Sequence, residues 1–306
     1  MSGRAIDLFA GAGGFTTGAT QAGATVVWAA NHWRGAVDIH AANHPDTEHS
    51  CQDLHQADWT QVPAHDLLLA SPCCQGHSRA RGKNSPQHDA SRSTAWAVVS
   101  AAEFHRPGVV VVENVPEFQA WTLYPAWTAA MGALGYTMSP HVLDAADHGV
   151  PQHRRRLILV GTRSRAPLRL DLERRPHVPA AEIIDVTSGR WSEVQAPRRS
   201  LATLARVSAA RSRFGARFVM PYYGSGSGLT GRSLERPIGT ITTLARWAVV
   251  DGDRMRMLTV DETRAAMGFP AGYRLPQQTR MAIHMLGNAV PPPLARDVVA
   301  AVMEAA

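Results

Sequence analysis

The sequence predicts an α/β fold, in which a parallel sheet with helical crossovers is combined with a smaller, irregular unit. Over the first 160 residues, short apolar runs alternate with longer helical patterns, as crossover connections between parallel strands require. After Thr162 the chain becomes rich in Arg, Pro and Ser, and its periodicity weakens. Regular patterning returns at Val260, so the irregular stretch is expected to interrupt one α/β domain.

The expected elements can be placed in order along the chain. Apolar runs predict strands at residues 5–9, 25–29, 66–69, 109–112 and 157–160. Helical spacing predicts helices at residues 14–22, 36–42, 94–105 and 126–134, and later at 260–267 and 293–305. Alternating Gly and Ser at residues 224–228 indicate a turn or flexible segment.

Composition excludes several classes of protein. With 306 residues, 45% hydrophobic and 18% charged, the chain can build a sizeable core, which argues against disorder. Its aliphatic runs are far shorter than the roughly 20 residues of a membrane span. The first nine residues lack the apolar stretch of a signal peptide, so we expect a cytoplasmic protein. Three cysteines, Cys51, Cys73 and Cys74, are too few for a disulfide framework or a four-ligand zinc site, so no metal is expected.

Positive charge is concentrated in one region. From Pro151 to Arg256 there are 20 arginines and 8 acidic residues, whereas the rest of the chain is acidic overall. Such a surplus suits a polyanion, because each neutralised phosphate releases counterions. A solvated surface would give the same count, and so would a genome that favours arginine, since the chain has 30 arginines and one lysine.

Two motifs lie at the ends of the first and third predicted strands. A glycine-rich turn after Asp7 lets a ligand approach the backbone closely, although such turns also occur without a ligand. The loop from Ser71 to Ser78 contains Cys73 and Cys74. A cysteine there can act as a nucleophile if its pKa is lowered, while the alternative is a pair of inert small residues.

Two further motifs supply a carboxyl group and arginines. Glu113 follows the fourth predicted strand and could donate a proton, or could simply be a surface or capping residue. Gln152, Arg154 and Arg156 are expected on one face of the strand that begins there. These arginines could stabilise a thiolate or bind a polar base edge, or they could form a solvated basic run.

Together these motifs, followed by the basic stretch and by Gly287 to Pro291, resemble the DNA cytosine-5 methyltransferase family, and its phage or prophage branch in particular. Segments 236–242 and 267–270 resemble further family motifs, so the likeness covers nearly the whole chain except the insert. It implies a Rossmann-like, S-adenosylmethionine-dependent methyltransferase sheet with a smaller irregular target recognition domain. The implied boundaries are 1–163 for the catalytic and cofactor-binding domain, 164–254 for target recognition, and 255–306 for a C-terminal segment completing the catalytic domain.

The resemblance also implies a reaction. Cys74 would add to carbon 6 of a flipped-out cytosine, and Glu113 would protonate ring nitrogen 3. The resulting enamine would attack a sulfonium methyl group, and loss of the carbon 5 proton would release Cys74. Arg154 would contact the cytosine carbonyl and the activated loop, while Arg156 and Gln152 would organise the site. Base flipping costs a few kcal/mol, and the positive charge of the insert could help to offset that cost.

The implied cofactor is S-adenosyl-L-methionine. The residues implied to bind it lie in the glycine-rich turn, after the following strands, and in the C-terminal segment: Phe9, Gly11, Gly13, Gly14, Asn31, His32, Asp53, Leu54, Pro72, Asn288 and Ala289.

The sequence departs from the family pattern in two places. Cys73 stands where the family has proline, with Pro72 one residue earlier, and the alignment of the following Gln75 favours Cys74 as the nucleophile. No carboxylate follows the second strand to bind the ribose, and Asn31 and His32 occupy that place. A carboxylated cofactor, carboxy-S-adenosyl-L-methionine, is therefore an alternative.

The expected partner is double-stranded DNA, bound by a monomer. Action on RNA, transfer of a carboxymethyl group, and a catalytically idle DNA-binding relative are the other functions that we weigh. The joint presence of Cys74, Glu113 and Arg154 argues against the idle protein.

Overall fold

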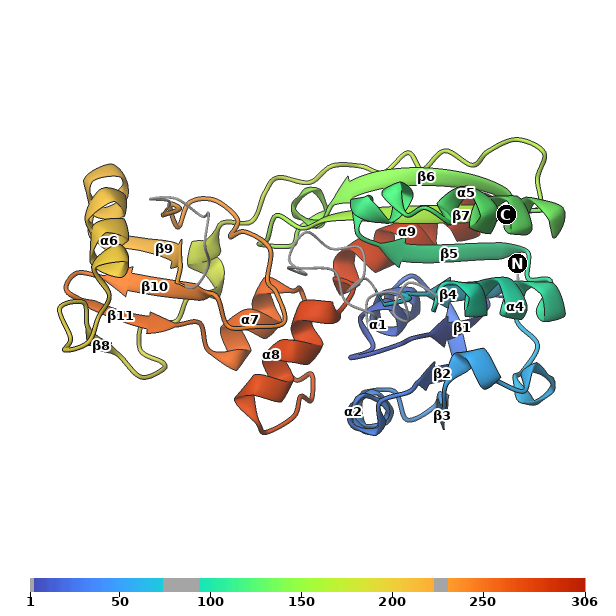
Figure 1. Cartoon of the computed structure of the whole chain (residues 1–306), viewed down its shortest axis with the longest axis horizontal. Coiled ribbons are helices and arrows are strands. Elements are labelled where there is room, and N and C mark those ends of the chain that lie inside the picture. Colours follow the sequence, from blue (N-terminus) through green and yellow to red (C-terminus); the bar gives the residue numbers. More distant parts are fainter. Residues whose placement is uncertain (1–2, 74–93, 223–230, 306) are drawn as a thin grey trace. The chain divides into compact units, whose positions relative to one another are not determined.

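The computed structural model describes residues 3–73, 94–222 and 231–305, and it divides the chain into two compact units (Figure 1). The first unit comprises Met1–Asp144, Arg155–Glu173 and Ala289–Ala306, and the second comprises Ala145–Arg154 and Arg174–Asn288. Residues 255–288 therefore pack within the second unit, while the final helix packs within the first. No helix in the described ranges has the length and apolarity needed to cross a membrane.

The first unit is built on a seven-stranded sheet with the order β3-β2-β1-β4-β5-β7-β6. The strands are β1 (Arg4–Leu8), β2 (Thr25–Asn31), β3 (Glu48–Cys51), β4 (Leu67–Ala70), β5 (Val109–Asn114), β6 (Thr137–Asp144) and β7 (Arg155–Thr162). Strands β1, β2, β4 and β5 pair in parallel with their neighbours among them, as expected, and β3, which was not predicted, pairs in parallel with β2. The expectation of a parallel partner at residues 157–160 is wrong, because β7 pairs antiparallel with both β5 and β6.

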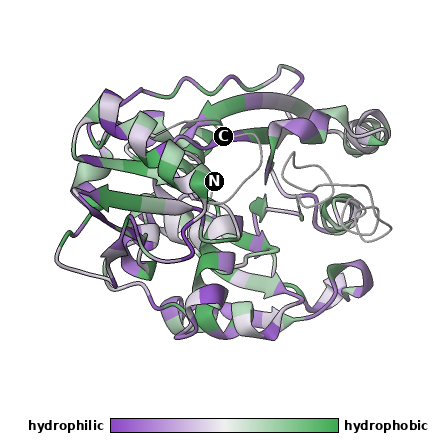
Figure 2. Cartoon of the chain, turned by 60° about the vertical axis from the view of Figure 1, so that its left-hand side comes forward, coloured by the Kyte–Doolittle hydropathy of each residue, from purple (hydrophilic) through white to green (hydrophobic). Residues whose placement is uncertain are grey.

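The helices of the first unit are α1 (Gly14–Gln21), α2 (Arg34–Asn43), α4 (Trp96–His105), α5 (Tyr124–Ala133) and α9 (Pro292–Ala305). The strands carry many hydrophobic residues, which appear as green arrows in Figure 2. On one face of the sheet, Ile6 and Leu8 of β1 pack in a buried cluster with Val98 of α4 and with Trp127 and Met131 of α5. Because side chains alternate along a strand, Asp7 points to the opposite face, where α1 lies.

Helices α1 and α9 approach each other so closely that one position in α1 has to be glycine. A Cβ atom added to Gly18 would lie 2.5 Å from the Cβ of Ala295 and 2.5 Å from the carbonyl oxygen of Pro292. Neither contact can relax by moving a flexible side chain. The sequence thereby fixes the last helix of the chain against the first.

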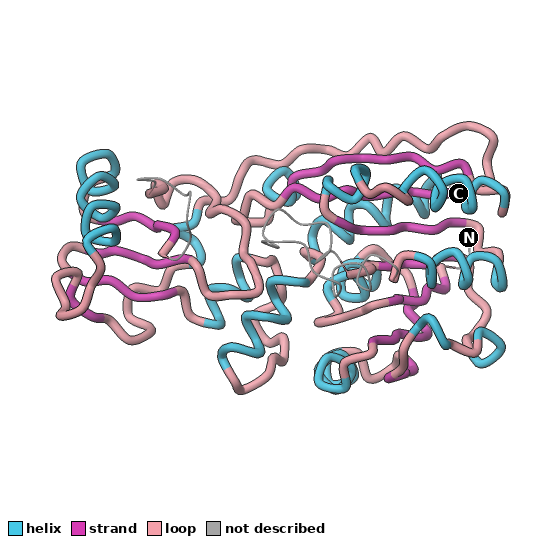
Figure 3. Tube along the Cα trace, viewed as in Figure 1, coloured by secondary structure: helices cyan, strands magenta, loops and turns pink. Residues whose placement is uncertain are grey.

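The second unit contains a four-stranded antiparallel sheet with the order β8-β11-β10-β9 (Figure 3). Its strands are β8 (Ser192–Glu193), β9 (Arg217–Pro221), β10 (Trp247–Asp251) and β11 (Arg254–Met257), and its helices are α6 (Leu201–Phe214), α7 (Val260–Ala266) and α8 (Thr279–Asn288). Val207 and Ala210 of α6 pack on Phe218, Met220 and Val250 of the sheet. The expectation of an irregular insert is therefore wrong in detail, because this region has a helix, a sheet and a core of its own.

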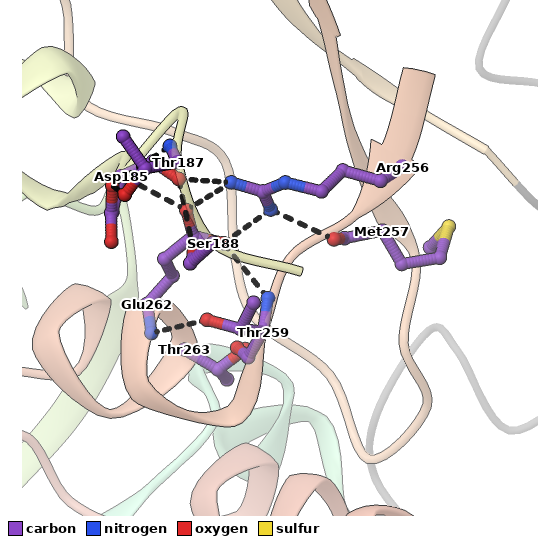
Figure 4. Close-up of polar contacts among 8 residues, drawn as sticks. All are labelled: Asp185, Thr187, Ser188, Arg256, Met257, Thr259, Glu262 and Thr263. Carbon is purple, nitrogen blue, oxygen red and sulfur yellow. Dashed lines mark hydrogen bonds and ion pairs between the residues drawn. The ribbon is translucent and has the colours of Figure 1, made fainter. Parts of the chain in front are cut away.

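A buried ion pair joins β11 to α7 in the second unit (Figure 4). Arg256 binds Glu262 through two hydrogen bonds of 2.7 and 2.6 Å, and Arg256 also donates to the carbonyl oxygens of Asp185 and Met257. Glu262 in turn accepts from the backbone N–H groups of Thr259 and Asp185, and it completes a capping box with Thr259. Arg256 thus stabilises the unit and is not available to a polyanion.

Candidate active site

The glycine-rich turn after β1 has a backbone that few residues adopt. Phe9, Gly11 and Gly13 have φ angles of 62°, 54° and 81°, so each lies in the left-handed region. The turn is anchored by a 3.0 Å hydrogen bond from the N–H of Ala10 to the carbonyl oxygen of Ala30 in β2. A non-glycine residue with positive φ marks local strain, which is common where a ligand binds. Gly14 follows as the first residue of α1.

The turn offers its backbone to a ligand. Among the described residues, a Cβ atom placed on Gly11 would meet a single atom within 4 Å, the carbonyl oxygen of Phe9 at 3.7 Å. The open space beside Gly11 matches the close approach that the methionine moiety of the expected cofactor needs.

The end of β2 holds the residues expected to bind ribose. The Oδ1 atom of Asn31 accepts a 2.9 Å hydrogen bond from the N–H of Trp33, so one polar atom of that amide is already engaged within the turn. His32 is exposed beside it. A diol can still bond to the remaining amide group, though without the strength of a charged acceptor.

Asp53 and Leu54 follow β3, the strand beside β2. The Asp53 Oδ1 atom accepts from the N–H of His55 and caps a short 3-10 helix that begins at Leu54. Asp53 is exposed and Leu54 is buried, which leaves the second carboxylate oxygen as an acceptor next to an apolar side chain. This combination suits an adenine ring with an exocyclic amino group.

The base of the cysteine loop is tied to the end of β5. The Asn114 amide donates a 3.1 Å hydrogen bond to the carbonyl oxygen of Pro72, and the N–H of Cys73 donates a 3.2 Å bond to the hydroxyl of Thr94. Pro72 is buried. Cys74 lies outside the described residues. Asn114 and Thr94 had no role in the sequence interpretation, although Asn114 directly follows Glu113, which was expected at this strand end.

Glu113 and Arg156 come together in the first unit. The Nε atom of Arg156 lies 2.8 Å from Oε1 of Glu113, and the exposed fractions of the two side chains are 10% and 8%. A carboxylate and a guanidinium this close attract strongly, and partial burial limits screening by solvent. The pair therefore holds the Glu113 carboxyl group in one orientation.

The structure contradicts the expectation that Gln152, Arg154 and Arg156 share one strand face. Strand β7 begins at Arg155, and Gln152 and Arg154 precede it in the second unit. The Arg154 guanidinium is buried and donates to the carbonyl oxygens of Ile241 and Gly287 at 2.9 and 2.8 Å. The Gln152 amide accepts from the N–H of Ile241 and donates to the carbonyl oxygen of Ala266.

Two expected cofactor residues lie near the end of the chain. Asn288 is the last residue of α8 in the second unit and is exposed, whereas Ala289 is buried and begins the C-terminal part of the first unit. The residues of the first unit fit S-adenosylmethionine, because they combine an open glycine-rich turn, an exposed acceptor and an apolar neighbour at adjacent strand ends.

Comparison with known proteins identifies the family of the chain. The sequence model of the family described as C-5 cytosine-specific DNA methylase matches residues 3–304. The chain is 28% identical over 305 residues to the Type II methyltransferase M.HgiDI of Herpetosiphon aurantiacus, covering 95% of this chain and 91% of that protein. It is 25% identical over 311 residues to the Type II methyltransferase M.HhaI of Haemophilus parahaemolyticus, covering 94% and 90%.

Solved structures show the same fold. A candidate DNA modification methyltransferase encoded within an E. coli prophage matches with a TM-score of 0.70 and 18% identity, covering 98% of each chain. The Dnmt2 methyltransferase of S. pombe matches with a TM-score of 0.68 and 14% identity, covering 99% of this chain and 98% of that one. The predicted methyltransferase fold is thereby confirmed. From its sequence and its fold, the chain belongs to the C-5 cytosine-specific DNA methylase family.

Proposed function

We propose that this chain transfers a methyl group from S-adenosylmethionine to carbon 5 of cytosine in double-stranded DNA, with Cys74 as nucleophile and Glu113 as proton donor. The 2.8 Å contact between Glu113 and Arg156 is the observation that supports this assignment best. It fixes a carboxyl group at the carboxyl end of β5, the strand whose Asn114 anchors the base of the Cys74 loop.

The chemistry follows from what these groups can do. Carbon 5 of cytosine is a weak nucleophile, so the Cys74 thiolate would add to carbon 6 while Glu113 gives a proton to ring nitrogen 3. The bound cofactor supplies an electrophilic methyl group to which carbon 5 then bonds. After a base removes the carbon 5 proton, Cys74 leaves as a thiolate and the proton on nitrogen 3 is returned.

We assign the two arginines differently from the sequence interpretation. Arg156 contacts Glu113, so it is the arginine that we propose to lie beside the cytosine carbonyl. Arg154 holds the backbone of Ile241 and Gly287, so we propose that it braces the second unit. The contact of Arg154 with the cytosine carbonyl, which the resemblance implies, stays a prediction.

DNA is the substrate of this family, and we propose that residues 164–254 read its sequence while the protein acts as a monomer. Exposed arginines at positions 190 and 198 support this role of the insert. Other arginines of the insert have internal partners. Arg199, for example, donates to the hydroxyls of Tyr222 and Ser192 and to the carbonyl oxygen of Glu193.

We favour S-adenosylmethionine over the carboxylated cofactor. Asp7, two residues before the glycine-rich turn, is a fully buried carboxyl group in the first unit, and its pKa is raised to about 7 by burial. A second negative group close to that turn would be repelled once Asp7 ionises. Mass spectrometry of nucleosides from modified DNA tests this choice, because a carboxymethyl product would be heavier than 5-methylcytosine.

The direct test is transfer of a labelled methyl group from S-adenosylmethionine to duplex DNA and, in parallel, to tRNA. We expect labelled 5-methylcytosine in DNA. Label in tRNA alone would contradict the proposed substrate, and label in neither would indicate a protein that binds DNA without modifying it.

A further inference from the structure

A chain of four hydrogen-bonded side chains lies behind the glycine-rich turn in the first unit. The Thr16 hydroxyl is 2.8 Å from Oδ2 of Asp7, and Nε2 of His40 is 3.0 Å from that same hydroxyl. At the far end, Nδ1 of His40 is 2.7 Å from Nε2 of His49. Asp7, Thr16 and His40 are all buried. We call this set the Asp7 relay.

The Asp7 relay connects four elements that surround the expected cofactor. Asp7 belongs to β1, Thr16 to α1, His40 to α2 and His49 to β3. The neighbouring Thr17 extends the connection, because its hydroxyl lies 2.7 Å from the carbonyl oxygen of Gly13 and 3.2 Å from Nε2 of His44. The residue that follows Thr16 in α1 thus hydrogen-bonds to the turn at Gly13.

The direction of these hydrogen bonds depends on a single proton. Ionised Asp7 can only accept, so the one Thr16 hydroxyl proton points toward Asp7. Thr16 must then accept from an Nε2–H of His40, and the bare Nδ1 of His40 accepts from His49. If Asp7 is protonated on Oδ2, it donates to Thr16 and every bond reverses. Protonation on Oδ1 would instead leave a buried donor without a partner, because Oδ1 has no hydrogen bond among the described residues.

The histidines near Asp7 do not supply a positive charge that would balance an ionised Asp7. Burial lowers the pKa of His40 well below its usual value, and burial also lowers the pKa of His44 to about 4 and that of His49. These imidazoles are therefore neutral near pH 7. Within the described part of the chain, no arginine or lysine forms an ion pair with Asp7. Among the described residues, its ionised form is thus buried without a cation, and burial raises the pKa of Asp7 to about 7.

We propose that Thr16 and His40 are positioning residues for the cofactor turn, and that the Asp7 relay adapts to the positive charge of the sulfonium cofactor by releasing its proton when that cofactor binds. This inference rests on the proposed use of S-adenosylmethionine. A cation beside the turn favours ionised Asp7, and ionised Asp7 sets the direction in which Thr16 and His40 hydrogen-bond. The neutral thioether product, S-adenosylhomocysteine, provides no such charge.

Calorimetric binding of the two ligands between pH 6 and pH 8 tests the proposal. For the wild-type chain we expect affinity for S-adenosylmethionine to rise about fivefold over this range, as for an opposite charge that lowers a carboxyl pKa of about 7 by one unit. Affinity for S-adenosylhomocysteine should change less than about threefold, because it lacks the sulfonium charge. Asp7→Asn should remove the difference between the ligands. The exposed Asp46→Asn variant, in the turn between α2 and β3, should keep it.

Variants of Thr16 separate positioning from folding. Thr16→Val keeps the shape of the side chain but removes a hydrogen bond that lowers the Asp7 pKa, so the rise in affinity for S-adenosylmethionine should move to higher pH, while Thr16→Ser restores a hydroxyl and should move it back. Equal pH dependence in the wild type, Thr16→Val and Asp7→Asn would overturn the proposal. If the wild-type chain bound neither ligand, the proposed cofactor would be wrong too. The proposal on the relay and the proposal on the cofactor therefore fail in different ways.

Nitrogen NMR of the wild-type chain reads the relay without any substitution. His40 should carry its proton on Nε2 at pH 8.5 and on Nδ1 at pH 5.5, with its signals identified by their loss in His40→Gln. An Nδ1 proton on His40 at pH 8.5 would contradict the direction that we derive.

Discussion

The Nε atom of Arg156 lies 2.8 Å from Oε1 of Glu113, and the two side chains come from adjacent antiparallel strands. In that pairing Glu113 is opposite Ile158, and Arg156 comes two positions before Ile158 in β7, so it lies past the last paired residue of β5, Asn114. The contact is therefore a consequence of strand register. It places a guanidinium beside a carboxyl group where β5 ends and β7 begins.

Glu113→Gln should lower kcat by about 10² to 10⁴, the usual contribution of a positioned general acid. Arg156→Gln should lower kcat as well, because it removes the partner that orients Glu113. Arg155→Gln is the matched control, since Arg155 is the exposed neighbour in the same strand. Steady-state methyl transfer measures all three. A normal kcat for Glu113→Gln would remove Glu113 from the reaction.

Asn31→Asp should tighten binding of S-adenosylmethionine. Asp can keep the turn contact to the N–H of Trp33 through one oxygen and offer a charged second oxygen to the ribose. One charge-assisted hydrogen bond is worth about 1 to 2 kcal/mol, or about 5- to 30-fold in Kd. Calorimetry checks this, with Asn43→Asp as a control that adds the same charge elsewhere. Weaker binding by Asn31→Asp alone would show that ribose does not lie there.

Replacing Arg190 and Arg198 with Ala should weaken binding to DNA of any sequence. Both are exposed, and each phosphate contact that is lost should reduce the slope of log affinity against log salt by about one. Lys at the same positions keeps the charge and should keep the slope. Arg199 is a poor choice for this test because it is bound to Tyr222, Ser192 and Glu193. An unchanged slope for the Ala variant would mean that these arginines face solvent.

Glu262→Gln should destabilise the second unit by about 3 to 5 kcal/mol, because it leaves a buried Arg256 without its counter-charge. Urea denaturation provides the measurement. Glu235→Gln, which changes an exposed carboxylate of the same unit, should have little effect. If Glu262→Gln cost less than about 1 kcal/mol, the pair would have to be solvated in solution.

Much of the first unit could be predicted because its strands are short apolar runs that end in chemically distinctive residues. All five predicted strands are present, with ends that differ by one or two residues, whereas β3 was not predicted. Strand β6 was missed because the sequence from Thr137 to Asp144 mixes polar residues with Pro140, which is atypical of a strand. With β6 absent from the prediction, the hairpin that makes β7 antiparallel could not be foreseen.

Some features of the second unit could not be predicted from the sequence, because they depend on contacts between residues that are far apart in the chain. Helix α6 has a polar sequence, and its apolar face is recognisable only against Phe218 and Val250. Arg256 was counted in the positive charge from Pro151 to Arg256, although it is buried and hydrogen-bonded to Glu262. The Asp7 relay has the same character, since nothing in one sequence shows that His40 and His49 meet behind β1.

Substitution of each cysteine in turn tests which of Cys73 and Cys74 is the nucleophile. Cys74→Ser should abolish methyl transfer, because a hydroxyl ionises far less than a thiol near neutral pH, whereas Cys73→Ala should retain activity. The reverse pattern would move the nucleophile to Cys73.

The covalent mechanism is tested most directly by trapping the enzyme on duplex DNA that contains 5-fluorocytosine. Fluorine cannot leave carbon 5 as a cation, so the adduct cannot eliminate and should accumulate with S-adenosylmethionine present. Peptide mass spectrometry should then place the modified base on Cys74. An enzyme that methylates ordinary cytosine but forms no adduct with this DNA would contradict addition of a cysteine to carbon 6.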